Sequence, residues 1–114
     1  MQVEYERCCG IDVHKETVVA CLRGREPTAM LSALRADEFD LVVTCTAPSP
    51  RGLPAAELTA AAIALGCDEV VERATVEAAL DHALRGAVAE DAILATGSLY
   101  TVGAARPHLR KVLP

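Results

Sequence analysis

The sequence has few aromatic residues and no long apolar segment. Phe, Trp and Tyr make up 3% of its 114 residues, and tryptophan is absent. The core must therefore be built mainly from Ala, Leu and Val. No apolar run approaches the roughly 18 residues typical of a membrane-spanning helix, and the opening MQVEYER is too polar for a signal peptide. These features predict a cytoplasmic protein without membrane contacts.

The cysteines form no recognisable metal or disulfide pattern. There are five of them, an odd number, and no C-x-x-C pair occurs. No cluster shows zinc-ligand spacing, and no histidine is placed beside a cysteine for nucleophilic catalysis. Four lie in apolar, strand-like surroundings, where a free cysteine packs as a small hydrophobic residue. This usage predicts a reducing compartment.

The charge balance disfavours nucleic-acid binding by this chain. The formal net charge is −5, and the sequence pI is about 5.1. Phosphate contacts need clustered Lys and Arg, but the basic residues gather only weakly, at positions 23–25 and 106–111. We interpret them as solvated surface charge.

The pattern of apolar residues predicts alternating strands and helices. Two β-type runs, 7–14 and 16–22, read as a hairpin at the amino terminus. The predicted helices cover residues 27–36, 55–66, 75–86 and 99–113, and the predicted strands between them cover 39–46, 67–72 and 91–96. Pro27, Thr75, Gly66 and Gly86 supply helix start and stop signals. Pro107 is expected to kink or divide the last helix.

This order predicts an α/β fold in a single domain spanning residues 1–114. Regular alternation at this spacing favours an open, mostly parallel Rossmann-like sheet with helices on both faces, preceded by the N-terminal β-hairpin. Residues 39–46 are continuously apolar, as expected for a strand covered on both faces in the middle of such a sheet.

Ligands of such sheets bind at the carboxyl ends of the strands, where two loops qualify. In residues 95–103, a strand runs into Gly97 and Ser98 just before a helix, so Ser98 is either a plain N-cap or a ligand for an anionic group. In residues 44–52, Arg51 is either an exposed cation or a clamp for a carboxylate or phosphate. We interpret His82 as structural and expect His108 to be exposed.

Several kinds of catalytic machinery are missing from the sequence. No segment carries the Gly-Lys-Ser/Thr ending of a phosphate-binding P-loop. Ser98 lacks the G-x-S-x-G elbow of a serine nucleophile. We therefore predict no catalytic residues, no bound metal and no cofactor for this chain alone.

The opening residues YERCCGIDVHKETVVAC resemble the start of DEDD-type insertion-sequence transposases. The resemblance covers residues 1–22 and implies a first metal-binding carboxylate at Asp12. The remaining chain lacks the further acidic motifs of that family, and one carboxylate cannot hold two metal ions. We interpret this segment as a strand borrowed by another fold. A DNA-processing fragment built around Asp12 is the alternative hypothesis.

The remainder, from about Val18 to Pro114, resembles the C-terminal domain of bacterial folylpolyglutamate synthase/dihydrofolate synthase, a relative of the Mur ligases. The matching segments are VACLRGREPTAMLSAL, FDLVVTCTAPSPRGLPAAEL and VEAALDHALRGAVAEDAILATGSLYTVGAAR. The Gly-Ser-Leu-Tyr run is the most characteristic of them. Residues 23–114 are thus expected to be the ligase-like part of the domain.

The resemblance implies an ATP- and Mg²⁺-dependent ligase that joins glutamate to a folate or pteroate through an acyl phosphate. It places Ser98 beside the incoming glutamate, with Gly97 and Tyr100 shaping the turn, and Arg25 and Arg51 toward the interdomain cleft. The family's P-loop domain and its Asp-Gly-Ala-His-Asn segment are absent from the sequence. We therefore expect a truncated domain that is inactive alone and needs that domain to bind glutamate, folate or ATP. A partner-binding module, with self-association through a bare sheet edge, is a third hypothesis.

Overall fold

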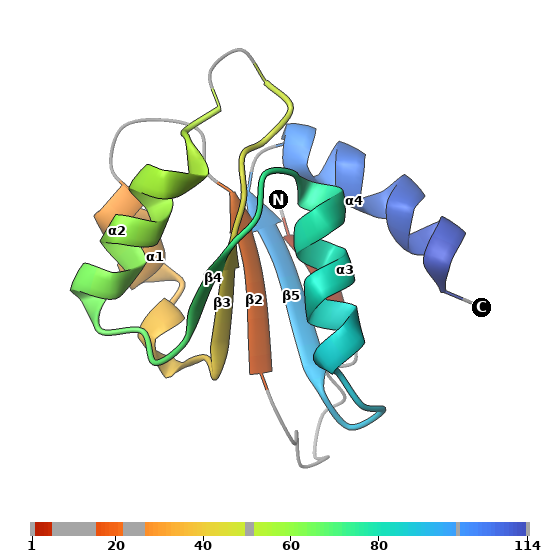
Figure 1. The fold of residues 1–114 in the computed structure, drawn as a ribbon, viewed down its shortest axis with the longest axis horizontal. Helices are drawn as coiled ribbons and strands as arrows, with labels where there is room; N and C mark the ends of the chain where they lie inside the picture. The colour runs from red at the N-terminus through yellow and green to blue at the C-terminus, as the bar shows by residue number, and fades with distance from the viewer. Residues whose placement is uncertain (1, 6–15, 22–26, 50–51, 98, 114) are drawn as a thin grey trace.

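A computed structural model of the chain describes residues 2–5, 16–21, 27–49, 52–97 and 99–113. Strands and helices alternate along it after an initial pair of strands (Figure 1). The strands are β1 (Gln2–Tyr5), β2 (Glu16–Cys21), β3 (Leu41–Thr44), β4 (Val70–Glu72) and β5 (Ala92–Gly97). The helices are α1 (Pro27–Ala33), the short 3-10 turn η1 (Ala36–Glu38), α2 (Ala55–Leu65), α3 (Val76–Gly86) and α4 (Leu99–Val112).

The strands form one five-stranded sheet in the order β1-β5-β2-β3-β4. β2, β3, β4 and β5 are mutually parallel, and β1 is antiparallel to β5. Helices α1 and α2 cover one face, and α3 and α4 cover the other (Figure 1). The predicted α/β class, with a mostly parallel sheet between two helical layers, is confirmed.

The predicted amino-terminal hairpin is wrong. β2 has β5 on one side over its whole length and β3 on the other, so neither edge is free for a hairpin partner. The first strand is instead β1, which pairs with β5. Residues 7–14, the predicted hairpin strand, lie outside the described residues.

Two apolar clusters hold the layers together, one on each face of the sheet. On the α1/α2 face, Leu58 packs with Val18, Val42 and Leu31, all completely buried. On the α3/α4 face, Leu80 and Val76 pack with Val19 and Val43. Every residue of β3 is buried, as its continuous apolar run predicts.

The helix boundaries follow the predicted signals. The Thr75 hydroxyl accepts the Ala78 N–H at 3.1 Å and caps α3, while Gly66 ends α2 with φ 97°. Pro107 does not divide α4, which is continuous over Leu99–Val112. Proline removes the hydrogen bond to the carbonyl of Gly103 one turn earlier, and Gly103 is exposed to water that can solvate this carbonyl. None of the helices in the described residues is long and apolar enough to cross a bilayer.

The prediction that His108 is exposed is also wrong. Its side chain is only 16% exposed, and its Nε2 lies 2.7 Å from Asp81 Oδ1. The contact links α4 to α3, because the buried face of α4 turns this position toward its neighbour. His108 therefore anchors the helix that follows β5.

Candidate functional site

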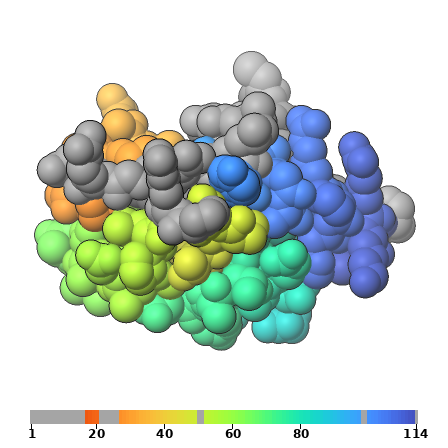
Figure 2. Space-filling view, turned by 90° about the horizontal axis from the view of Figure 1, so that it is seen from above, coloured from red at the N-terminus to blue at the C-terminus, as the bar shows by residue number. Residues whose placement is uncertain are grey.

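The carboxyl ends of the four parallel strands form one edge of the molecule. The register aligns Cys21 with Gly97 and Thr44 with Glu72 at this edge. Helices α2, α3 and α4 each start here, and Figure 2 looks down onto this end of the molecule. The amino-terminal ends of helices carry partial positive charge, so this edge is suited to anionic ligands.

The transition from β5 to α4 has the predicted geometry. β5 ends at Gly97, and α4 begins two residues later at Leu99. Gly97 has φ 153°, a value that favours glycine over residues with a side chain. The amino-terminal end of α4, with its partial positive charge, therefore lies directly beside this turn, where it favours an anionic group such as a carboxylate.

The structure brings only part of the predicted site together. Gly97 and Tyr100 lie on either side of the turn, and the Tyr100 side chain is exposed. Its neighbour Thr101 is completely buried, which fixes the first turn of α4 against the protein. The predicted residues Ser98, Arg25 and Arg51, and Asp12 of the transposase hypothesis, lie outside the described residues.

The loop between β3 and α2 is closed by its own residues. The Thr46 hydroxyl accepts the N–H of Ala55 at 3.0 Å and so caps α2, a role that Pro54 at the N-cap position cannot fill with its side chain. Gly52 N–H donates to Ser49 O at 2.9 Å. A Cβ at Gly52 would lie 2.7 Å from the Ala47 carbonyl oxygen, so only glycine fits. The described residues of this loop are therefore held together at its base.

A chain of hydroxyl groups orients a carboxylate at this edge. Thr44 Oγ1 lies 2.7 Å from Thr59 Oγ1, and Thr59 Oγ1 lies 2.8 Å from Glu72 Oε1. Thr44 is completely buried at the end of β3, whereas Glu72 is exposed at the end of β4. When Thr59 donates to the carboxylate, it can accept from Thr44, so the three side chains are held together.

Arg73, the residue after Glu72, joins the end of β4 to α3. Arg73 donates through Nη1 to the Glu72 carbonyl oxygen at 2.7 Å, and its Nη2 lies 3.1 Å from Nδ1 of His82. Since a guanidinium is only a donor, His82 Nδ1 accepts, and the ring is the Nε2–H tautomer. His82 is half-buried on α3, and this contact links α3 to the residue that follows β4.

One cavity lies away from this edge. Its volume is about 460 Å³, and it opens where β5 begins, between the ends of α3 and α4. Its walls include Leu84, Val88, Ile93 and Val112. The cavity is thus at the opposite end of β5 from Gly97 and contributes nothing to the candidate site. Within the part of the chain that the structure describes, no three His, Cys, Asp or Glu side chains are arranged to hold a metal ion.

Cys67 is expected to be an unreactive thiol. Partial burial, followed by the carboxylates of Asp37 and Asp68, raises its pKa. Below this pKa, a higher value reduces the thiolate fraction more than it increases thiolate nucleophilicity. Iodoacetamide at pH 8, with peptide mapping by mass spectrometry, should alkylate Cys67 more slowly than a cysteine in a model peptide. Asp68→Asn should speed the reaction, and Glu77→Gln, a distant control, should not.

Comparison with known protein families identifies the family of this domain. The family model for the glutamate ligase domain of Mur ligases matches residues 12–99, which is most of the chain. The chain belongs to this family. The match includes the Gly97 turn and starts slightly before Val18, the predicted start of the resemblance. Curated protein sequences yield no match.

Solved structures with the same fold include folylpolyglutamate synthases. Two Mycobacterium tuberculosis folylpolyglutamate synthase structures, one with ADP and one with ADP and AMPPCP, are 28% and 29% identical, with TM-scores of 0.72 and 0.69 over 87% of this chain. A bifunctional folylpolyglutamate synthase/dihydrofolate synthase from Yersinia pestis, complexed with AMPPNP and a manganese ion, shares the fold at 22% identity and TM-score 0.70 over 84% of the chain.

This Mur ligase domain spans only 22–24% of the length of those enzymes. The described residues contain no phosphate-binding loop of the kind that would hold the triphosphate of ATP. The described residues alone therefore do not supply a complete nucleotide site. The resemblance of residues 1–22 to transposases stays a prediction, because Asp12 is outside the described residues.

Sequence reasoning missed several residues of the edge. They are Thr44, Thr46, Thr59, Glu72 and Arg73. The signal available was polarity in an apolar context, since Thr44 ends an apolar strand and Thr59 interrupts an alanine-rich helix. Nothing local indicates that Thr59 meets Thr44 and Glu72, which lie 15 and 13 positions away from it in the sequence.

Proposed function

We propose that this chain is the glutamate-binding domain of an ATP-dependent carboxylate–amine ligase of the folylpolyglutamate synthase/dihydrofolate synthase type. The family match and the 28–29% identity to the Mycobacterium tuberculosis enzymes support the proposal. The observation that carries it is the Gly97 turn, which leads directly from the carboxyl end of β5 into α4. This position is where an incoming amino acid would meet the positive, amino-terminal end of α4.

In this proposal the chain binds and orients glutamate. The positive, amino-terminal end of α4 attracts a carboxylate of glutamate, and Ser98, by resemblance, supplies a hydroxyl beside it. Buried Thr101 keeps the helix end fixed, so the amine is presented in a defined direction. Fixing one reactant in this way lowers the entropic cost of reaction. The amine then attacks an activated carboxyl of the folate substrate, an amide bond forms and phosphate leaves.

Activation of the folate carboxyl requires ATP and Mg²⁺, which in this proposal are held by a second, P-loop domain. That domain would also hold the folate. The chain alone is therefore expected to show no ligase turnover. Clear ATP- and glutamate-dependent turnover by the purified 114-residue chain would contradict this assignment.

Glutamate binding can be tested by NMR on the ¹⁵N-labelled chain. Titration with L-glutamate at millimolar concentrations should shift the backbone amides of Gly97 and Leu99–Thr101, because these groups surround the proposed carboxylate site. D-glutamate is the matched control, since it has the same charge but presents its amine in another direction. Equal shifts with both enantiomers, or shifts only near the cavity at Val88, would argue against the site.

A chimera tests whether the domain works within a ligase. The C-terminal domain of Mycobacterium tuberculosis folylpolyglutamate synthase would be replaced by this chain. The chimera should regain glutamate-dependent turnover relative to the enzyme lacking that domain. A folded chimera with no turnover would leave the fold assignment intact but count against the proposed activity.

A further inference from the structure

The sheet has an open edge at β4. In the described residues, no strand lies beyond β4. Its two valines are only half-buried, whereas every residue of the neighbouring β3 is buried. An edge strand with partly covered valines is a template for pairing with another strand.

The hydrogen bonds to β3 show which backbone groups of β4 face outward. Val42 N–H donates to Glu69 O, and Arg73 N–H donates to Thr44 O, both at 2.9 Å. In a parallel pair, alternate residues direct both backbone groups to the same neighbour. The backbone groups of Glu69, Val71 and Arg73 therefore face β3, and Val70 and Glu72 direct their N–H and C=O groups to the open edge. The Glu72 carbonyl oxygen accepts from Arg73 Nη1 and has a second lone pair for an N–H of another strand.

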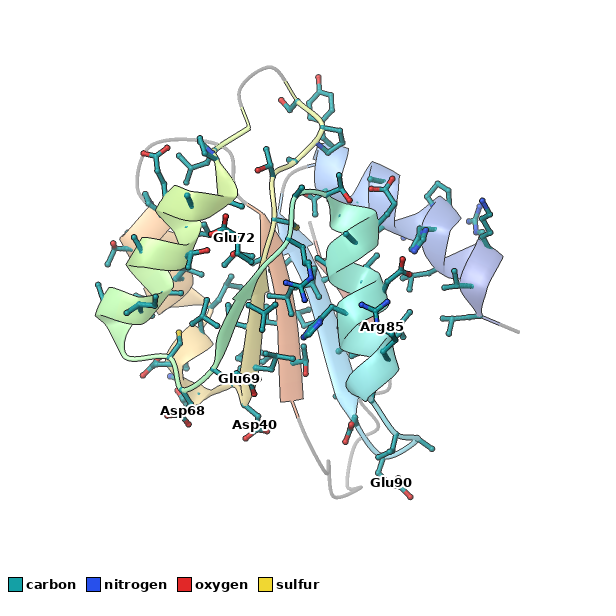
Figure 3. The ribbon with its side chains drawn as sticks, in the orientation of Figure 1. Asp40, Asp68, Glu69, Glu72, Arg85 and Glu90 are labelled. Carbon is teal, nitrogen blue, oxygen red and sulfur yellow. The ribbon has the colours of Figure 1, made fainter. Side chains whose placement is uncertain are left out.

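The side chains of β4 divide between the two faces. Val71 packs on the α3/α4 face and Val70 on the α1/α2 face. By alternation Glu69 and Arg73 share the face of Val71, and the contact of Arg73 with His82 on α3 agrees with this. Figure 3 labels Glu69, just before the start of β4, and Glu72, at its end.

These positions complement a second copy of the same strand. We infer that two chains associate by antiparallel pairing of their β4 strands about a two-fold axis at Val71. In this register, Val70 exchanges both backbone hydrogen bonds with Glu72 of the partner subunit. Glu69 lies directly opposite Arg73 of the partner subunit on the same face. Four backbone hydrogen bonds and two opposite-charge pairs thus form from one short strand.

The outer surface of α2 supports the same arrangement. Thr59 contacts Glu72, so this side of α2 lies beside β4. Ile63, one turn along, is 63% exposed, and the helix also exposes Ala56, Ala60 and Ala64. A two-fold axis perpendicular to the sheet brings α2 next to α2 of the second copy. The dimer would therefore cover an apolar helix face that lies open in the single chain.

Sedimentation equilibrium of the 114-residue chain over a range of concentrations tests this inference. The wild-type chain should show a monomer–dimer equilibrium. Val70→Pro should give a monomer, because it removes an outward N–H without breaking a bond to β3. Ile63→Ser should weaken the dimer. Val88→Ser, at a valine that is 54% exposed and lies just before β5, should not. A monomeric wild-type chain would overturn the inference, as would a dimer indifferent to Val70→Pro.

A charge exchange tests the register independently of any folding defect. Glu69→Lys places like charges opposite each other and should raise the dimer dissociation constant about tenfold. Glu69→Lys combined with Arg73→Glu should restore it, with circular dichroism confirming the fold of each variant. A double variant weaker than both single variants would refute this register. The inference does not depend on the proposed function, because none of these measurements involves glutamate.

Discussion

Replacing Leu58 with alanine is expected to lower the free energy of unfolding by about 3 kcal/mol. Leu58 is completely buried between α2 and the sheet, where it packs with Val18 and Val42. Leu31, Leu58 and Leu80 are the largest of the fully buried side chains. Much of the remaining core is alanine and valine, which are too small to fill the cavity left by a leucine. Urea denaturation followed by circular dichroism measures the loss.

Ile63→Ala is the matched control, because it removes a side chain of similar size from the same helix. Ile63 is 63% exposed, and alanine is the better helix former. Its expected effect is within about 0.5 kcal/mol of zero, measured at a concentration where the chain is monomeric. Equal losses for the two variants would contradict the argument that burial of the Leu58 face stabilises α2.

The second large effect is expected at the turn before α4. Gly97→Ala places a side chain at φ 153°, which costs about 1–3 kcal/mol where the backbone cannot relax. Any relaxation shifts the first turn of α4, and a displacement of about 1 Å can reduce turnover about 100-fold. In the chimeric ligase, Gly97→Ala should therefore lose most glutamate-dependent turnover.

Gly103→Ala provides the control on the same helix. A Cβ at this position meets nothing within 4 Å, and alanine stabilises a helix by about 0.5–1 kcal/mol relative to glycine. This variant should be slightly more stable than the wild type and should keep its turnover. If both glycine variants retained full activity, the Gly97 turn would not be the glutamate site.

The elements were predictable because their signals are local. The apolar run of β3, the Thr75 cap and the Gly66 stop each act within a few residues of chain. The partner of the first strand was not predictable in this way. Apolar alternation shows that a segment is a strand, but it does not show which strand lies beside it, and β1 pairs with a strand about 90 positions later.

The candidate site likewise has a part that could be predicted from local sequence and a part that depends on tertiary packing. The strand–Gly97–helix transition is a local feature and was found from the sequence. The chain of Thr44, Thr59 and Glu72 exists only after α2 packs beside β3 and β4. His108 was misjudged for the same reason, since only the packing of α4 on α3 brings it to Asp81. Side chains that meet through tertiary packing carry no spacing signal.

The antiparallel direction of β1 bears on how this protein should be handled. Gln2 pairs with Thr96, so the chain enters the sheet immediately beside the Gly97 turn. Helix α4 carries the other terminus away from that turn over 14 residues, or about 21 Å. An affinity tag or fusion protein ahead of Gln2 would sit at the entrance to the candidate glutamate site, whereas one joined after Pro114 would leave it open.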